Sequence, residues 1–308
     1  MSAYPRTGGR SAVWRLALIW AALAHLCLAA GYARAEDTLS KIRRTQTVVI
    51  AYANHQMPFV DDNPDGQVYG YSIDICNKIV EALRLELKLP QIKTRFIRVD
   101  SVGRFDSLLK GESDIECGAS TNNASRRQQV AFTIPHFFTT TRMLVRKDST
   151  IHDWGDLREK RVALVRGNAV FAYAKSRNEA RMLDIKWTEV ASEAEAMKLV
   201  EAGSVDAYVE DDVLLFSYRT EMKSPEQFAI VGEALSVDPY AMMMRKNDAP
   251  FKAVVDREMV RMITQKEIYQ FYDRWFMRPL GINRAALNLP MSYLLRDSLR
   301  FPTDKVAD

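Results

Sequence analysis

Residue types that hold metals and cofactors are scarce in this chain. It has four histidines and three cysteines among 308 residues. His55, His136 and His152 lie in no HExxH or CxxC pattern, so the sequence predicts neither a metal centre nor a Ser-His-Asp arrangement. A GxxxxGK(S/T) loop is also absent, which excludes ATP hydrolysis by that route. No cofactor is expected.

A long membrane-spanning run is missing as well. The apolar run at residues 16–30 is shorter than the roughly 20 residues that a spanning helix needs. Three arginines precede this run, and Ala33-Arg34-Ala35 is typical of a signal-peptide cleavage site. We therefore predict a secretory signal peptide over residues 1–35, cleaved after Ala35.

Neither sign of charge is in excess once this segment is removed. Four of the 43 basic residues and none of the 39 acidic residues lie in it, so 39 of each sign remain. This balance gives no indication of a nucleic-acid partner. Cys76 and Cys117 also remain, and in an oxidising compartment they either form a disulfide or stay as buried free thiols.

The chain does have a regular alternation of strand and helix patterns, which predicts an α/β fold. Strands are expected at residues 47–52, 93–99 and from 115, with helices at 72–87 and 104–109. A second alternation predicts strands at 161–165, 185–189, 207–210 and 228–231, with helices ending near 176 and at 192–201 and 212–220. Three more helices are expected at 250–264, 266–276 and 292–299.

Two long apolar segments, residues 136–145 and 237–245, bracket the second alternation. We interpret them as paired crossover strands between two α/β lobes. Residues 36–142 and 241–308 would form lobe 1, and residues 143–240 lobe 2. In open α/β sheets ligands bind beyond the carboxyl ends of strands, so a cleft is expected where such ends meet.

Three predicted turns at strand ends suit a ligand: Gly118, Gly167 and Glu210-Asp211-Asp212. The segment DIECGASTNNASR at residues 114–126 is the most informative. Gly118 would let the backbone approach a ligand, and a helix N-terminus after the hydroxyl and amide residues would suit an anion. The Arg126 guanidinium matches a carboxylate. The alternative is an ordinary capped helix with a surface arginine.

Several motifs resemble the periplasmic solute-binding proteins of polar amino-acid ABC transporters (family 3 type), most closely the glutamate/aspartate-binding group. The most specific is ECGASTNNASRRQQVAF at residues 116–132. Others are VYGYSIDI at 68–75, DLREKRVALVRG at 156–167 and AGSVDAYVEDDVLL at 202–215, and the C-terminal WFMRPLGINRAALNLP. The resemblance covers essentially the whole chain after residue 35. It implies a type II periplasmic binding protein fold with two α/β sandwich lobes joined by two hinge strands.

The resemblance also implies ligand contacts. Arg126 matches the arginine that holds the α-carboxylate, and Asp211 matches the carboxylate that takes the α-ammonium group. Asp211 could instead cap the following helix, and Arg104 could form a surface ion pair. The turn of Ala119, Ser120 and Thr121 matches the loop beside the ligand. First-lobe and cleft-wall positions are Ser101, Arg104, Phe59 and Tyr71, with a core position as the alternative for Phe59.

Four departures from that group fall on the side-chain pocket. Ala53 replaces an arginine, Ala119 a serine and Glu193 a histidine, and the second-lobe turn around Asn168 lacks the usual Thr and Ser. Glu193 could pair with Arg104 or Arg166. We therefore expect glutamate and aspartate to bind more weakly than the resemblance implies, and a neutral polar or larger ligand to compete.

The sequence thus predicts a binding protein rather than an enzyme. A monomer in the periplasm would capture an amino acid and deliver it to an inner-membrane permease. One alternative is an enzyme of the same fold, similar to cyclohexadienyl dehydratases, with Glu193 as general acid. Another is a ligand sensor that acts through a separate receptor.

Overall fold

The computed structural model describes residues 36–53, 55–279 and 286–306. The predicted signal peptide lies outside the described residues. No helix within these described ranges is long and apolar enough to cross a membrane. All the elements below belong to the unit Thr38–Asp308.

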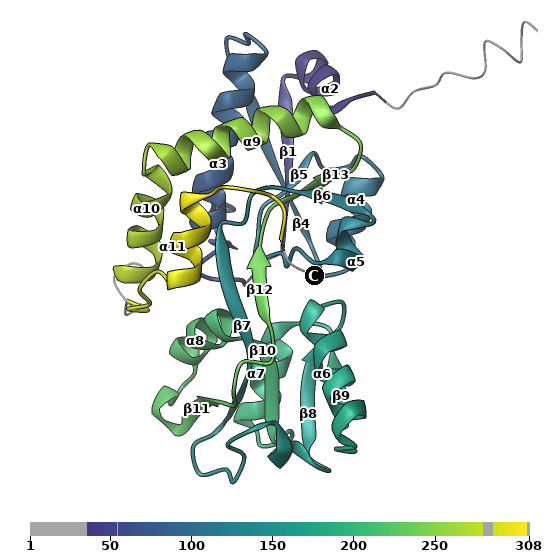
Figure 1. Cartoon of the computed structure of the whole chain (residues 1–308), viewed down its shortest axis with the longest axis vertical. Coiled ribbons are helices and arrows are strands. Elements are labelled where there is room, and N and C mark those ends of the chain that lie inside the picture. Colours follow the sequence, from purple (N-terminus) through teal and green to yellow (C-terminus); the bar gives the residue numbers. More distant parts are fainter. Residues whose placement is uncertain (1–35, 54, 280–285, 307–308) are drawn as a thin grey trace, which may run out of the picture. The chain divides into compact units, whose positions relative to one another are not determined.

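The first sheet has the order β4-β1-β5-β13-β6 (Figure 1). Its centre is β1 (Thr47–Ala53), whose β-branched residues suit a strand that is buried along almost all its length. β1 runs parallel to β4 (Lys93–Val99) and β5 (Ile115–Glu116), and β13 (Met243–Arg245) pairs antiparallel with β5 and β6 (Val130–Phe132).

Four helices predicted for this half are confirmed, two of them, α9 (Ala249–Thr264) and α11 (Tyr293–Arg300), in its C-terminal part. α3 (Tyr71–Glu86) buries Ile75, Ile79 and Leu83 at helical spacing. α4 is Gly103–Leu109. The predicted helix 266–276 is confirmed as one continuous helical segment, in which α10 (Glu267–Tyr272) passes into a π-helical turn. The remaining elements of this half are α2 (Thr38–Thr45), β2 (Asp61–Asp62), β3 (Val68–Tyr69), α5 (Ala124–Arg127) and the turn Asp273–Met277.

The second sheet has the order β11-β7-β10-β8-β9. Its strands are β7 (Phe137–Arg146), β8 (Arg161–Val165), β9 (Lys186–Val190), β10 (Ala207–Asp211) and β11 (Phe228–Val231). Three helices follow its strands, α6 (Ala169–Arg181), α7 (Glu193–Glu201) and α8 (Asp212–Glu221). Short 3-10 turns lie at Trp154–Leu157 and Pro225–Gln227. α6 runs past the predicted end near residue 176 and stops at Met182, which is left-handed.

Two segments connect the sheets, as predicted. β7 pairs with β12 (Val237–Tyr240), so the outgoing and returning chains run side by side (Figure 1). The returning segment is not one strand as expected. It breaks between β12 and β13, because the N–H of Ala241 donates to the Ser120 carbonyl and the N–H of Met242 to Thr133 Oγ1. The lobe boundaries at residues 142 and 240 stay a prediction.

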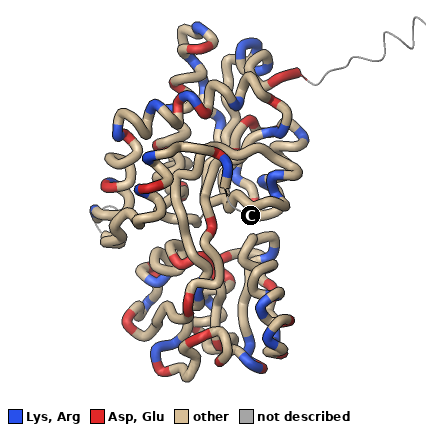
Figure 2. Tube along the Cα trace, viewed as in Figure 1, with Lys and Arg blue, Asp and Glu red and all other residues tan. Residues whose placement is uncertain are grey.

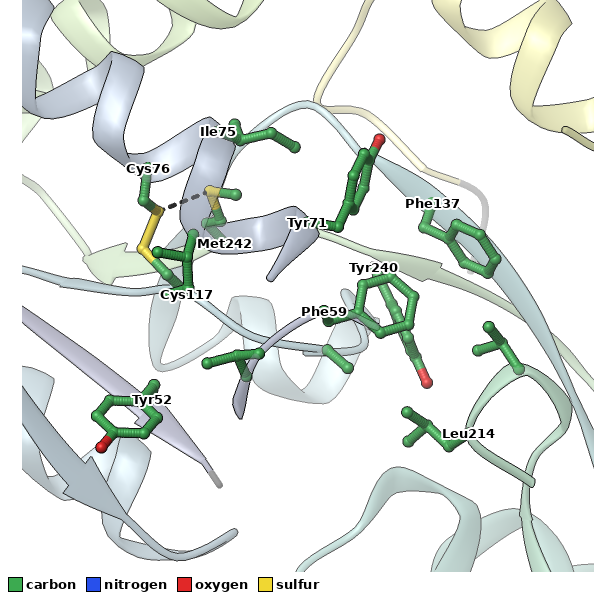
Figure 3. Close-up of a cluster of buried hydrophobic side chains, with 14 of the residues drawn as sticks. Tyr52, Phe59, Tyr71, Ile75, Cys76, Cys117, Phe137, Leu214, Tyr240 and Met242 are labelled. Carbon is green, nitrogen blue, oxygen red and sulfur yellow. Dashed lines mark hydrogen bonds between the residues drawn. A yellow bond between two sulfur atoms is a disulfide. The ribbon is translucent and has the colours of Figure 1, made fainter. Parts of the chain in front are cut away.

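An aromatic cluster fills the core where these connections leave the first sheet (Figure 3). Phe59 lies at its centre, with ring centroids 5.0 Å from Phe137, 5.2 Å from Tyr240 and 5.6 Å from Phe276. A disulfide lies beside this cluster (Figure 3). It joins Cys76 of α3 to Cys117, so of the two states left open by the sequence, the structure shows the bonded one.

Candidate ligand-binding site

The turn after β5 brings the predicted anion-binding residues together, but not through a long helix. Asn123 caps α5 by accepting the Arg126 N–H at 3.0 Å. α5 is only four residues long, so its dipole contributes little to anion binding. A Cβ on Gly118 would lie 2.7 Å from Glu116 Oε1 and 3.1 Å from Gln56 Oε1. The glycine therefore makes room for these side chains, and the expected approach of a ligand to its backbone stays a prediction.

Arg126 is buried, so the alternative of a surface arginine is wrong. Its guanidinium donates to the Thr121 carbonyl at 3.0 Å and to the Gly167 carbonyl at 3.4 Å, and it lies 5.3 Å from the Phe105 ring centroid. Burial, together with the nearby Arg104 charge, lowers the pKa of Arg126 from 12.5 to about 9. No carboxylate among the described residues forms an ion pair with it.

Arg104 is buried too, and the surface ion pair considered for it does not form. It donates through Nε to the Ser101 carbonyl at 3.1 Å and through a terminal nitrogen to Ser120 Oγ at 3.0 Å. Ser120 in turn donates to Glu116 Oε2 at 2.8 Å. Burial raises the pKa of Glu116, while the Arg104 charge opposes the rise.

Glu116 was missed by the sequence analysis. It lies fully buried on β5, and no hydrogen-bond partner within the described part of the chain reaches its Oε1. The signal was an acidic residue inside an otherwise apolar strand pattern, Ile115-Glu116-Cys117. A buried carboxylate that links to an arginine through a serine supports the position of that arginine.

The second sheet contributes Asp211, at the end of β10. It occupies the N-cap position of α8 but makes no capping bond, so the capping alternative is wrong. The Tyr240 hydroxyl donates to its Oδ2 at 2.5 Å, whereas its Oδ1 is buried without a partner among the described residues. Figure 3 shows this hydroxyl projecting from the aromatic cluster. Burial, then the Glu210 and Asp238 charges, raises the pKa of Asp211 well above its ordinary value.

Glu210 and Asn168 form a second polar group beside it. The Asn168 amide donates to both Glu210 oxygens, at 2.7 and 2.8 Å, and the Tyr208 hydroxyl donates at 2.8 Å. Burial, then the Glu193 charge, raises the pKa of Glu210 to about 7. Asn168 thus holds a carboxylate of its own chain.

A cavity of about 290 Å³ lies between the ends of strands of the two sheets. The first sheet lines it with Ala53 and the segment 98–101, and the second with the segment 191–193. Ala53, Ser101 and Glu193 therefore meet in one space, as the resemblance implied. Glu193 is only 8% exposed, and its burial raises its pKa.

Two predicted site residues lie elsewhere. Phe59 and Tyr71 are fully buried in the aromatic cluster and are not among the residues that line this cavity, so the structure shows them in core packing. Ala119 lies in the turn, but its N–H donates to Gln56 Oε1 at 3.2 Å.

Within the described ranges, no group of three or more His, Cys, Asp or Glu side chains could hold a metal ion.

Comparison with known proteins identifies the family. Residues 48–278 match the model of the bacterial extracellular solute-binding proteins, family 3. The chain belongs to this family. It is 34% identical over 273 residues to the L-glutamate/L-aspartate-binding protein of Pseudomonas aeruginosa, covering 88% of this chain and 90% of that protein. It is 31% identical over 291 residues to the glutamate/aspartate import solute-binding protein of Escherichia coli, covering 92% and 96%.

Solved structures confirm the fold of this family 3 protein. The cysteine-binding protein from Campylobacter jejuni superposes with a TM-score of 0.69 at 24% identity, covering 78% of this chain and 93% of that one. The predicted two-lobed α/β fold of type II periplasmic binding proteins is therefore confirmed.

Proposed function

We propose that this chain is the periplasmic substrate-binding component of an amino-acid ABC transporter, and that it holds its ligand by the α-carboxylate and the α-ammonium group. The observation that carries this proposal is a pair of buried, opposite and incompletely satisfied groups, Arg126 and Asp211. One comes from each side of the cleft, and a zwitterion would complete both.

Arg126 donates only to carbonyl groups, so its positive charge has no anionic partner within bonding distance in the described chain. Burying an unpaired charge is costly, and the lowered pKa of Arg126 reflects that cost. An α-carboxylate would supply the missing anion and accept two parallel hydrogen bonds.

Asp211 lacks a cationic partner in the same way that Arg126 lacks an anionic one, within the described residues. Its Oδ1 is buried and has no hydrogen-bond partner among the described residues, while Oδ2 accepts the Tyr240 hydroxyl. An ammonium group with three donors would satisfy the free oxygen and favour the ionised carboxylate. Arg126 and Asp211 together therefore fit the common part of every α-amino acid rather than one side chain.

The proposed function also implies a membrane partner, a location and a conformational change. The Escherichia coli relative named above is an import solute-binding protein, which supports an inner-membrane ABC permease as the partner. We propose that the chain is exported, works as a monomer in the periplasm, and closes about β7 and β12 when the ligand bridges the two sheets. Closure would exclude water and strengthen each charged hydrogen bond.

A thermal-shift screen of the mature protein against the common L-amino acids tests this function. A ligand that binds the native state raises the unfolding midpoint, by an amount that grows with ligand concentration. We expect at least one amino acid to do so, and small-angle scattering to show a smaller radius of gyration at saturation. No shift with any amino acid would contradict the proposal.

One observation favours a second function, an enzyme. Glu193 is a buried carboxylate with a raised pKa at the cavity wall, which is what a general acid requires. Incubation with prephenate or arogenate would then yield an aromatic product, and Glu193→Gln would abolish it. The named relatives are binding proteins, and we regard binding as the function.

A further inference from the structure

The side-chain end of the site is the cavity lined by Ala53, Ser101 and Glu193. It is linked to the anchors through Arg104, which donates to the Ser101 carbonyl and to Ser120, the neighbour of Thr121. A ligand held by Arg126 would therefore extend its side chain toward Glu193. The charges around this cavity decide which side chain is stable there.

Glu193 is the first residue of α7 and is more than nine-tenths buried. Among the described residues, no Lys, Arg or His nitrogen lies within 4.0 Å of its carboxylate. Within the described ranges, its own backbone N–H is the hydrogen-bond donor that stabilises the charged form, with weaker help from the more distant Arg104 and His55 charges. Glu193 is thus a buried acceptor at the cavity wall that lacks a side-chain donor.

The arginines near the cavity already have partners. Arg98, which lines it, forms an ion pair with Asp62, and the Tyr52 hydroxyl donates to the same carboxylate. Arg166, the other partner considered for Glu193, lies 4.0 Å from Glu189 instead.

Arg104 is also engaged, through Ser120, with the buried Glu116. Asp100, which lines the cavity, adds a second carboxylate to its wall, where it accepts the N–H groups of Val102 and Gly103. The wall therefore has more acceptors than free donors.

We propose, resting on the proposed function, that this site selects amino acids with a cationic side chain, an ammonium or a guanidinium group, and that Glu193 is the selecting residue. A cationic group in the cavity would donate to the Glu193 carboxylate and offset its buried charge. A carboxylate there would meet Glu193 as a like charge, with no uncommitted arginine to hold it. The ligand preference would then be opposite to the glutamate and aspartate in the names of the relatives.

Calorimetry with L-lysine, L-arginine, L-glutamine and L-glutamate tests the proposal on the wild-type protein. We expect lysine or arginine to bind at least about 30-fold more tightly than glutamate, which is the scale of one buried charge pair. Tighter binding of glutamate or glutamine overturns the selectivity but leaves the proposed function intact. If none of the four ligands nor any other amino acid binds, the proposed function itself fails.

Variants then locate the effect at Glu193. Glu193→Gln should weaken binding of the cationic ligand at least tenfold and strengthen glutamate binding, and Glu193→His should favour glutamate further. Glu195→Gln is the matched control, because Glu195 is an exposed acid in the same helical turn. If Glu193→Gln leaves the lysine-to-glutamate ratio unchanged, or Glu195→Gln changes it equally, the role of Glu193 is excluded. The wild-type ranking decides the selectivity even if a variant does not fold.

Discussion

The two sides of the candidate site carry opposite charges and are stabilised in different ways. The first sheet presents an arginine face, Arg104 and Arg126, whose hydrogen bonds go to carbonyls and a serine. The second presents a carboxylate face of Glu193, Glu210 and Asp211, which accept from an amide, from hydroxyls and from backbone N–H groups. Neither face neutralises the other by a direct ion pair within the described residues. The difference agrees with our proposal that the charges are kept apart for a ligand that bears both signs.

The charged residues of the two faces are buried, whereas many charged residues elsewhere in the described chain are exposed. Basic and acidic residues are interspersed over both halves of the molecule (Figure 2). Most of the ion pairs are at least partly exposed and contribute little to stability, as such pairs generally do. Buried charges elsewhere are paired, such as Asp114 with Lys41 and Glu258 with Arg261, whereas we propose that the unpaired charges at the cleft are offset by a bound ligand.

The largest expected effect comes from removing either anchor. Arg126→Ala and Asp211→Ala should each weaken ligand binding by about 2–5 kcal/mol, because the opposite charge of the ligand is left unpaired. Calorimetry with the best ligand of the screen measures this. Arg127→Ala is the control, since Arg127 donates to Asn122 and belongs to neither face. Near-native affinity in either anchor variant would remove that residue from the site.

The disulfide distinguishes the two faces, because it constrains the turn of the arginine face and has no counterpart at the carboxylate face among the described residues. Cys117 directly precedes the Gly118 turn, and its bond to Cys76 ties that turn to α3. The double substitution Cys76→Ser, Cys117→Ser should lower the free energy of unfolding by about 2–4 kcal/mol. Denaturant unfolding measures the loss. An unchanged midpoint would show that the bond does not constrain the turn.

The pH dependence of stability should have opposite signs in the core and at the carboxylate face. Burial lowers the pKa of His136 to about 3, and both its ring nitrogens are buried without a partner among the described residues. As the pH falls below about 6.5 the unfolded state gains a proton that the folded state excludes. Stability should then fall by up to about 1.4 kcal/mol per pH unit, and His136→Phe should remove this slope.

Glu210 should make the protein more stable, not less stable, as the pH falls. Its pKa is raised from 4.5 to about 7, so the folded state binds a proton at a higher pH than the unfolded state. The contribution of Glu210 to the free energy of unfolding is therefore fully present below about pH 4.5, and it is lost as the pH rises through about 7. Unfolding curves of Glu210→Gln and wild type from pH 5 to 8 test this. A wild-type advantage that grows with pH would contradict the sign.

The smallest effect is a proton released on binding. The pKa of Asp211 is raised in the empty site, and a ligand ammonium group should lower it again. Binding near pH 6 should therefore release protons and become weaker as the pH falls. Calorimetry in buffers of different ionisation enthalpy detects this release, and Asp211→Asn should abolish it. Identical enthalpies in all buffers would show that Asp211 is already ionised.

Much of this fold could be predicted from the sequence, because its periodic patterns are local. β4 and β11 have the expected bounds, and most other elements agree within two residues. The break after Tyr240 and the change from α-helix to π-helix after Tyr272 could not be predicted from such patterns. The first depends on hydrogen bonds from Ala241 and Met242 to residues more than 100 positions away.

The site was harder to predict for the same reason. Motifs identified Arg126 and Asp211, whose surroundings agree with a binding role that remains a proposal. Glu116 was missed because a buried carboxylate in a strand is recognised only once its partners, Ser120 and the more distant Arg104 charge, are seen. The resemblance implies a cleft-wall position for Phe59, and the structure shows the alternative core position, because an aromatic side chain suits both.

The central claim is that the two faces hold the α-carboxylate and the α-ammonium group of one amino acid. The most direct test is calorimetry of the wild-type protein with its best amino acid, with the α-amide of that amino acid and with its N-acetyl form. We predict that each derivative binds at least about 30-fold more weakly than the free amino acid, because each leaves one buried charge unpaired. Equal affinity for either derivative would contradict the account.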